Sequence, residues 1–204
     1  MPRTKISREP LLAIAWEVFH RRGFAGTSLA DLSRATGLGK AGLLHHFGSK
    51  AGLVEAVIAW AREAFRGYVL SAFAKTGSDA QGRPWTPERR LGEALRRQFH
   101  LAQRDGAGCF FANSMLEVGA DAPYAEQLRG FVDDWLGAVA GMLAERYPRA
   151  EAEERAYRLF TDYQGSVMLF KVSTDESHLR RFRERAVASL AHPLAPAGPQ
   201  TVPA

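Results

Sequence analysis

The sequence has little cysteine and no long apolar run. Its 204 residues include a single cysteine, Cys109, so an internal disulfide and a site of several thiolates are both excluded. No apolar run reaches the roughly 18 residues that a membrane-spanning helix needs. The N-terminal stretch MPRTKISREP is basic but is not followed by an apolar segment of signal-peptide type. We therefore expect a cytoplasmic protein that does not enter a membrane.

The sequence also lacks the arrangements that catalysis and metal binding require. No acid and base pair, no nucleophile beside a base and no cluster of metal ligands stands at usable spacing. His45 and His46 are adjacent, so on a helix they diverge by about 100° and cannot hold one ion together. The stretch GLGKAG, residues 37–42, fits the dinucleotide pattern G-x-G-x-x-G, but no strand precedes it. We predict no enzyme, no metal site and no cofactor.

Positive charge is concentrated near the N-terminus. The formal net charge is +5, from 27 Lys and Arg against 22 Asp and Glu. Residues 1–50 hold eight of the basic residues and three of the acidic ones, which leaves 19 of each in the rest of the chain. A basic segment on a neutral body suggests contact with nucleic acid or an acidic membrane surface, although a merely solvated basic face fits the charge equally well.

Helical periodicity is the dominant pattern, and no stretch alternates as a strand would. The fold class that we predict is all-α with about nine helices, divided into a DNA-binding domain at 1–50, a larger domain at 51–191 and a disordered, proline-rich tail at 192–204. The expected helices are 7–22, a short one within TSLADLSRATG, KAGLLHHF at 40–47, a long one from Lys50 through Lys75, and then 87–104, 109–119, 123–147, 150–173 and 176–191.

Two of these short helices are joined by the tight turn ATGLG, which is the pattern of a helix-turn-helix. Small side chains at Ala41 and Gly42 let the second helix approach a duplex, while Lys40 and His45 can reach phosphates or base edges in the major groove. An ordinary corner between two helices has the same spacing, so that alternative stays open at this point.

The first quarter of the chain resembles the DNA-binding module of the tetracycline-repressor (TetR) family of bacterial regulators. The resemblance covers the run from LLAIAWEVFHRRGF to LLHHFGSKAGL. Matching positions are Ala15, Phe19, Gly23, Phe24, Thr27, Leu32, Ala35, Gly37, Leu38, Leu43, His46, Phe47, Lys50 and Leu53. The remainder is similar to the family in length, helical content and helix order.

The resemblance implies roles for individual residues. Thr27, Ser28 and Lys50, at helix starts, would contact phosphates, as helix N-termini favour anions. The surface that reads DNA bases would be formed by Lys40, Ala41, Gly42, Leu44 and His45. Two features depart from the family: Leu44 stands where Tyr is usual, and glycines stand at 39 and 42 where Ser or Thr is usual. Leu44 can instead touch a thymine methyl group.

In this family the C-terminal helices dimerise and enclose a pocket whose ligand releases DNA. The segments RAYRLFTDYQGSVMLFKV and HLRRFRERAVASLAH resemble the last two helices, which pack on a partner copy. The expected interface residues are Leu159, Gly165, Leu169, Phe182 and Leu190, although packing within one subunit explains the same pattern. A homodimer would place two reading helices about 34 Å apart, as a palindromic operator requires.

The stretch GAGCFFANSMLEVGADAP resembles a G-C-x-x-x-N segment of some family members. Phe110, Phe111, Met115 and Trp135 would line an apolar cavity, with Asn113 as its polar group, and plain core packing is the alternative. Cys109 would either contribute as a sensor of electrophiles or oxidants or remain a buried, inert thiol.

The resemblance identifies the chain as a candidate dimeric repressor that binds double-stranded operator DNA and is released by a small-molecule effector. The alternative is an architectural protein that binds DNA without sequence preference or effector.

Overall fold

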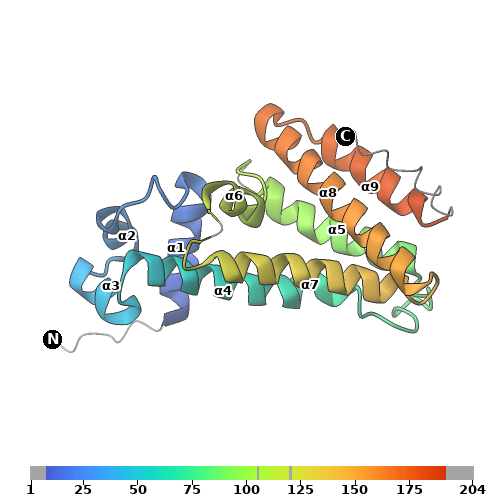
Figure 1. Ribbon diagram of the computed structural model, residues 1–204, viewed down its shortest axis with the longest axis horizontal. Helices are drawn as coiled ribbons and strands as arrows, with labels where there is room; N and C mark the ends of the chain where they lie inside the picture. The colour runs from blue at the N-terminus through green and yellow to red at the C-terminus, as the bar shows by residue number, and fades with distance from the viewer. Residues whose placement is uncertain (1–7, 105, 120, 192–204) are drawn as a thin grey trace, which may run out of the picture.

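The computed structural model describes residues 8–104, 106–119 and 121–191, and it confirms the all-α fold class (Figure 1). These residues form nine α-helices and a short 3-10 helix, η1, and no strand. The helices are α1 (Arg8–Arg22), α2 (Leu29–Thr36), α3 (Lys40–Phe47), α4 (Lys50–Tyr68), η1 (Leu70–Ala72), α5 (Pro87–Gln103), α6 (Phe110–Glu117), α7 (Ala125–Leu143), α8 (Arg149–Ser173) and α9 (Ser177–Ser189). The predicted tail at 192–204 lies outside the described residues.

The first three helices gather at one end of the molecule, and α4 connects them to the rest (Figure 1). α4 packs on α1 near its start and on α7 further along. α8 packs against both α7 and α9, and α9 also packs on α5. The short helix α6 lies between the N-terminal helices and the long helices of the body. In the described ranges, no helix has the length and apolarity needed to cross a membrane.

Three of the helices, α2, α4 and α5, begin at a polar side chain that caps them. Ser28 and Asp31 form a capping box at the start of α2. Ser49 Oγ accepts a hydrogen bond of 3.0 Å from Gly52 N at the start of α4. Thr86 Oγ1 accepts one of 3.3 Å from Arg89 N at the start of α5. These side chains satisfy backbone donors that have no partner within the helix, which fixes where each helix starts.

The long helix predicted from Lys50 through Lys75 is shorter in the structure. α4 ends at Tyr68, and the chain tightens into η1, where Phe73 N bonds Leu70 O at 3.0 Å. Phe73 is buried, and its carbonyl accepts a hydrogen bond of 3.1 Å from the buried guanidinium of Arg90 on α5. These groups are buried against α5 because the chain changes direction after Tyr68, and helical periodicity in the sequence does not predict that change.

Apolar residues recur at helical spacing along one face of α4, and all but the half-buried Trp60 are buried. Leu53, Val57, Ala61 and Phe65 are all buried, and they belong to a core that extends from the N-terminal helices into the body. Because one face of α4 packs in both regions, a displacement of this helix would move side chains in the N-terminal helices and in the body together.

Candidate DNA-binding surface and ligand pocket

α2 and α3 form a helix-turn-helix around residues 37–39. Gly37 ends α2 with a φ of 70°, a left-handed conformation that glycine adopts without steric cost. Leu32 of α2 and Leu43 of α3 are almost fully buried, and they anchor both helices on the core. The opposite face of α3 is therefore free to meet solvent or a ligand (Figure 1).

The exposed face of α3 carries four of the predicted DNA-contacting residues: Lys40, Ala41, Leu44 and His45. Leu44 is 39% exposed, which places an apolar side chain on a polar surface. The rings of His45 and His46 lie 5.8 Å apart, and no group of three or more potential metal ligands occurs in the described part of the chain. The face thus offers a cation, ring nitrogens and an apolar side chain, which suit phosphates, base edges and a thymine methyl group respectively.

Gly42 has a packing reason to lack a side chain. A Cβ atom there would lie 2.7 Å from Cγ of Leu38, a residue of the turn that precedes α3. The turn therefore closes tightly against the helix because position 42 is glycine. Its contact with DNA stays a prediction.

Thr27 and Ser28 are both held by hydrogen bonds within the protein. Thr27 is buried, and its hydroxyl donates to Gly23 O at 2.7 Å. Ser28 is exposed, and its Oγ accepts from Asp31 N at 3.2 Å. Hydrogen bonds from Ser28, first from its hydroxyl and then from its backbone, lower the pKa of Asp31 to about 2. Of these two residues, Ser28 is the one that reaches the surface.

Lys50 is half-buried at the first position of α4. Its ammonium group belongs to the helix start that Ser49 caps, where the partial positive charge of the helix end also favours anions. This place beside α3 is suitable for a phosphate contact.

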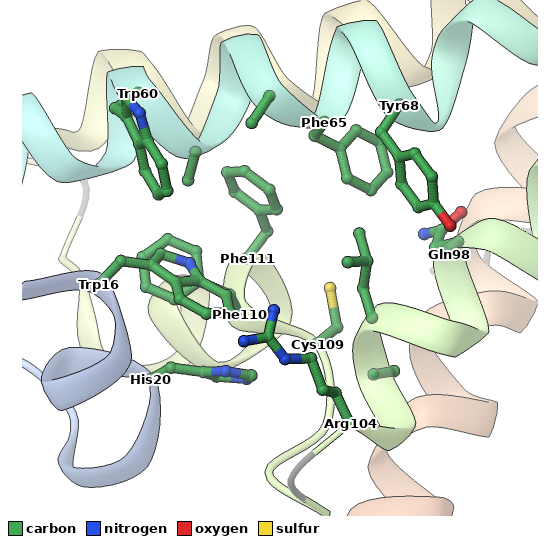
Figure 2. Close-up of a pocket in the computed structure, with 14 residues that line it drawn as sticks. Trp16, His20, Trp60, Phe65, Tyr68, Gln98, Arg104, Cys109, Phe110 and Phe111 are labelled. Atoms are coloured by element: carbon green, nitrogen blue, oxygen red, sulfur yellow. The ribbon is translucent and has the colours of Figure 1, made fainter. Parts of the chain in front are cut away.

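A largely apolar cavity of about 240 Å³ lies where α1, α4, α5 and α6 meet. Figure 2 shows Trp16 and His20 from α1, Trp60 and Phe65 from α4, and Phe111 from α6 around it. The complete lining is Trp16, His20, Trp60, Ala61, Ala64, Phe65, Tyr68, Gln98, Leu101, Ala102, Arg104, Cys109, Phe110 and Phe111. Its walls therefore come from segments that are far apart in the sequence.

Three of the six predicted pocket residues line this cavity: Cys109, Phe110 and Phe111. Asn113 instead donates to Ala107 O at 2.7 Å and accepts from Lys171 Nζ at 2.8 Å. Met115 is partly buried against the core, and Trp135 is completely buried behind the cavity. Trp135 still touches the site indirectly, because its Nε1 donates to Gln98 Oε1 at 3.2 Å.

Sequence reasoning missed the contributions of α1, α4 and α5 to the cavity. In the structure Trp16 and Trp60 are half-buried, and the polar side chains of His20 and Gln98 are buried. No local pattern of the sequence shows that these four side chains meet at one cavity.

The thiol in the cavity wall is held in its neutral form. Burial raises the pKa of the Cys109 thiol, although the thiol lies at the start of α6, a place that otherwise favours a thiolate. Burial also raises the pKa of the neighbouring Tyr163 well above its usual value. His20 Nε2 donates to Gly108 O at 3.0 Å, since a carbonyl oxygen can only accept.

α6 also touches the N-terminal helices directly. A carboxylate oxygen of Glu117 accepts hydrogen bonds from Phe24 N at 2.6 Å and from Ala25 N at 3.2 Å. Phe110, at the other end of α6, packs edge-on against His20 and Phe24 with centroid distances of 5.9 and 6.2 Å. The helix that helps to wall the cavity is thus attached to the loop that leads into α2.

The predicted interface residues fall into two groups. Gly165 and Leu169 are exposed on α8, whereas Leu159, Phe182 and Leu190 are enclosed within the protomer. Sequence periodicity does not separate these groups, because α8 and α9 have apolar residues on more than one face. Further exposed apolar residues on α8 are Tyr157, Met168 and Val172.

A helix-turn-helix attached to a helical body that contains a cavity defines a helix-turn-helix transcriptional regulator. Residues 11–57 match the family described as bacterial regulatory proteins, tetR family. The HTH-type transcriptional repressor DhaR of Mycobacterium sp. (strain GP1) is 25% identical over 195 residues, which cover 89% of this chain and 90% of DhaR.

Solved structures share the fold along almost the whole chain. A TetR transcriptional regulator from Legionella pneumophila superposes with a TM-score of 0.78 at 18% identity, covering 92% of this chain and 98% of that one. AibR in complex with isovaleryl coenzyme A and operator DNA gives a TM-score of 0.64 at 16% identity, covering 88% and 95%. The N-terminal module is therefore similar to the tetR family of bacterial regulatory proteins, and the chain as a whole has the fold of solved TetR regulators.

Proposed function

We propose that this protein is a transcriptional repressor that binds a palindromic operator as a homodimer and leaves it when a small molecule occupies the cavity. The observation that carries the proposal is the shared wall: Trp16 and His20 of α1, next to the helix-turn-helix, line the same cavity as residues of the body. AibR, a structural relative, was solved with both a ligand and operator DNA, which supports the combination. We assign DNA binding to a domain of residues 1–50, and ligand binding and dimerisation to a domain of residues 51–191.

On DNA, α3 enters the major groove. Lys40, Leu44 and His45 face base edges, and Ala41 allows close approach of the helix. Ser28 and Lys50 contact phosphates from the starts of α2 and α4, and Thr27 supports that region from inside. Phosphate contacts orient the protein, and the α3 side chains select the sequence.

The second copy binds along α8. Four residues of α8 share one face of the helix, because the intervals between them are eight, three and four residues: Tyr157, Gly165, Met168 and Val172. Leu169 lies beside this face. Val172 is 88% exposed, and a Cβ at Gly165 would meet no atom within 4 Å. A lone protomer leaves this apolar stripe in water, whereas a partner helix can pack closely over the glycine.

Release follows from linkage between the two sites. A ligand that prefers a conformation with the wrong spacing of the two α3 helices must weaken DNA binding by its own differential binding energy, typically about 1–3 kcal/mol. α4 and α6 transmit the change, because each lines the cavity and each also touches the N-terminal helices.

Nuclease footprinting on the DNA that flanks the gene, with excess competitor DNA and near-physiological salt, tests the regulator proposal. A short protected palindrome supports a specific dimeric regulator. If random-sequence selection with the same protein also yields no preferred site and binding is merely steeply salt-dependent, the proposal fails and an architectural role takes its place.

A further inference from the structure

The chemistry of the cavity restricts its ligand. The volume of about 240 Å³ exceeds that of a cavity of about 150 Å³ known to hold benzene, and it lies below the roughly 300 Å³ at which pockets for drug-sized ligands begin. A molecule of about two fused rings fits this space. Trp16, Trp60, Phe65 and Phe110 supply aromatic walls on several sides, which favours a flat aromatic ligand (Figure 2).

Gln98 supplies a specific polar contact. Its amide orientation is determined by Trp135, because the indole N–H can only donate and so Gln98 must present Oε1 to it. The Nε2 group therefore points away from the Trp135 indole. This atom is buried, as is Gln98 as a whole at 2% exposure, and it makes no hydrogen bond of good geometry with the described residues; the Tyr163 hydroxyl is the polar group beside it. A buried donor without an acceptor is costly, and a ligand acceptor placed in the cavity would relieve that cost.

The buried thiol and phenol beside the cavity carry no charge. Cys109 lines it and Tyr163 lies behind Cys109, and both groups are held neutral by burial. The one Lys or Arg in the lining, Arg104, has a side chain that is 53% exposed and lies 3.6 Å from Glu17. A charged ligand would lose its hydration, and the side chain of fixed charge in the lining, Arg104, is half-exposed and already lies near Glu17.

We propose that the cavity binds an uncharged aromatic molecule of about two fused rings, with one hydrogen-bond acceptor that takes the Nε2 proton of Gln98. The acceptor is a carbonyl, ether or ring nitrogen. This inference rests on the proposed function in that it names the class of effector, and it excludes the enclosure of an acyl coenzyme A within the cavity.

Equilibrium dialysis of the full-length protein against three matched probes tests the inference. Coumarin has two fused rings and a carbonyl acceptor, naphthalene has the same shape without an acceptor, and coumarin-3-carboxylate adds a charge. We expect coumarin to bind about tenfold more tightly than naphthalene, the effect of one hydrogen bond to a buried donor. We expect coumarin-3-carboxylate to bind more weakly than coumarin.

Two variants of Gln98 isolate the contact. Gln98→Met and Gln98→Leu both remove the Nε2 donor, and Met has nearly the length of Gln. Coumarin should lose about tenfold in affinity for both, and naphthalene should bind Gln98→Met as it binds the wild type. Gln127→Met, on α7 and outside the lining, is the control, and thermal unfolding shows that each variant is folded.

Three results would overturn the inference: equal affinities for coumarin and naphthalene, coumarin binding that is insensitive to Gln98, or tighter binding of coumarin-3-carboxylate or isovaleryl coenzyme A than of coumarin. The proposed function fails separately. If coumarin binds through Gln98 but leaves the operator complex intact at saturation, the proposed ligand class is supported, and the proposal that a ligand in this cavity releases DNA is refuted. If another ligand releases the operator while no probe binds, the ligand class falls and the function stands.

Discussion

Replacement of Glu117 by alanine should detach α6 from the loop that leads into α2. In the structure the Glu117 carboxylate accepts hydrogen bonds from the N–H groups of Phe24 and Ala25, and among the described residues no other side chain bonds to these two backbone donors. Phe24 itself is buried, so its N–H group cannot be fully hydrated when the carboxylate is removed. Glu117→Ala therefore leaves one poorly solvated donor and one that water can reach.

The size of the effect follows from these two environments. A buried donor that loses its partner costs about 1–3 kcal/mol, and the exposure of Glu117 argues for the low end, about 1 kcal/mol. For a chain of this length, 1 kcal/mol lowers the melting temperature by about 2–4 °C. Glu117→Gln retains an acceptor and should recover most of the loss. Glu55→Ala, an exposed residue of α4, should change stability by less than about 0.5 kcal/mol.

Two measurements check this prediction. Thermal unfolding is followed by circular dichroism at one fixed protein concentration, because a dimer melts at a concentration-dependent temperature. Hydrogen exchange of a peptide that contains Phe24 and Ala25 reports the local contact, and Glu117→Ala should accelerate its exchange. Unchanged exchange in this peptide would show that the carboxylate does not hold the loop, and only the packing of Phe110 on His20 and Phe24 would then connect α6 to the N-terminal helices.

Further predictions concern the DNA surface, the interface and acid stability. Lys50→Ala should weaken binding to all DNA sequences and reduce the slope of log K against log salt concentration by about 1, whereas the control Lys75→Ala should change neither. DNA titrations at several salt concentrations measure this slope, and an unaltered slope would show that Lys50 makes no phosphate contact. His45→Ala should relax the preference at one base pair of each half-site, and an unchanged set of selected sequences would argue against base reading by this residue. Gly165→Asp should give monomers in sedimentation, with Gly137→Asp on α7 as a control; a persisting dimer would place the interface elsewhere. The pKa of Asp31 is lowered to about 2, so its charged form stabilises α2 above the usual value of 3.8, and this contribution is lost as pH falls from about 4 to about 2. Asp31→Asn should therefore destabilise the protein at pH 6 and lose that difference near pH 2 in acid unfolding curves; a difference independent of pH would refute the role of the charge.

The sequence by itself determined the helical class, the position of most helix starts and the helix-turn-helix. These features depend on local chemistry: Ser28 with Asp31 caps α2, Gly37 allows a left-handed turn, and Leu53, Val57 and Phe65 repeat at the helical period. Each of these signals lies within a few residues of the feature that it specifies, so no knowledge of distant contacts is needed.

The tertiary structure decided which residues surround the cavity and which apolar residues of the last helices remain exposed. Trp16, Trp60 and Gln98 are distant in the sequence and meet only when α1, α4 and α5 pack together. Phe182 and Leu169 read alike as apolar helix residues, yet one is enclosed by α5 and α8 and the other faces solvent. Periodicity shows that a face is apolar, but the neighbour that covers it is chosen by long-range packing, and that information is not local in the chain.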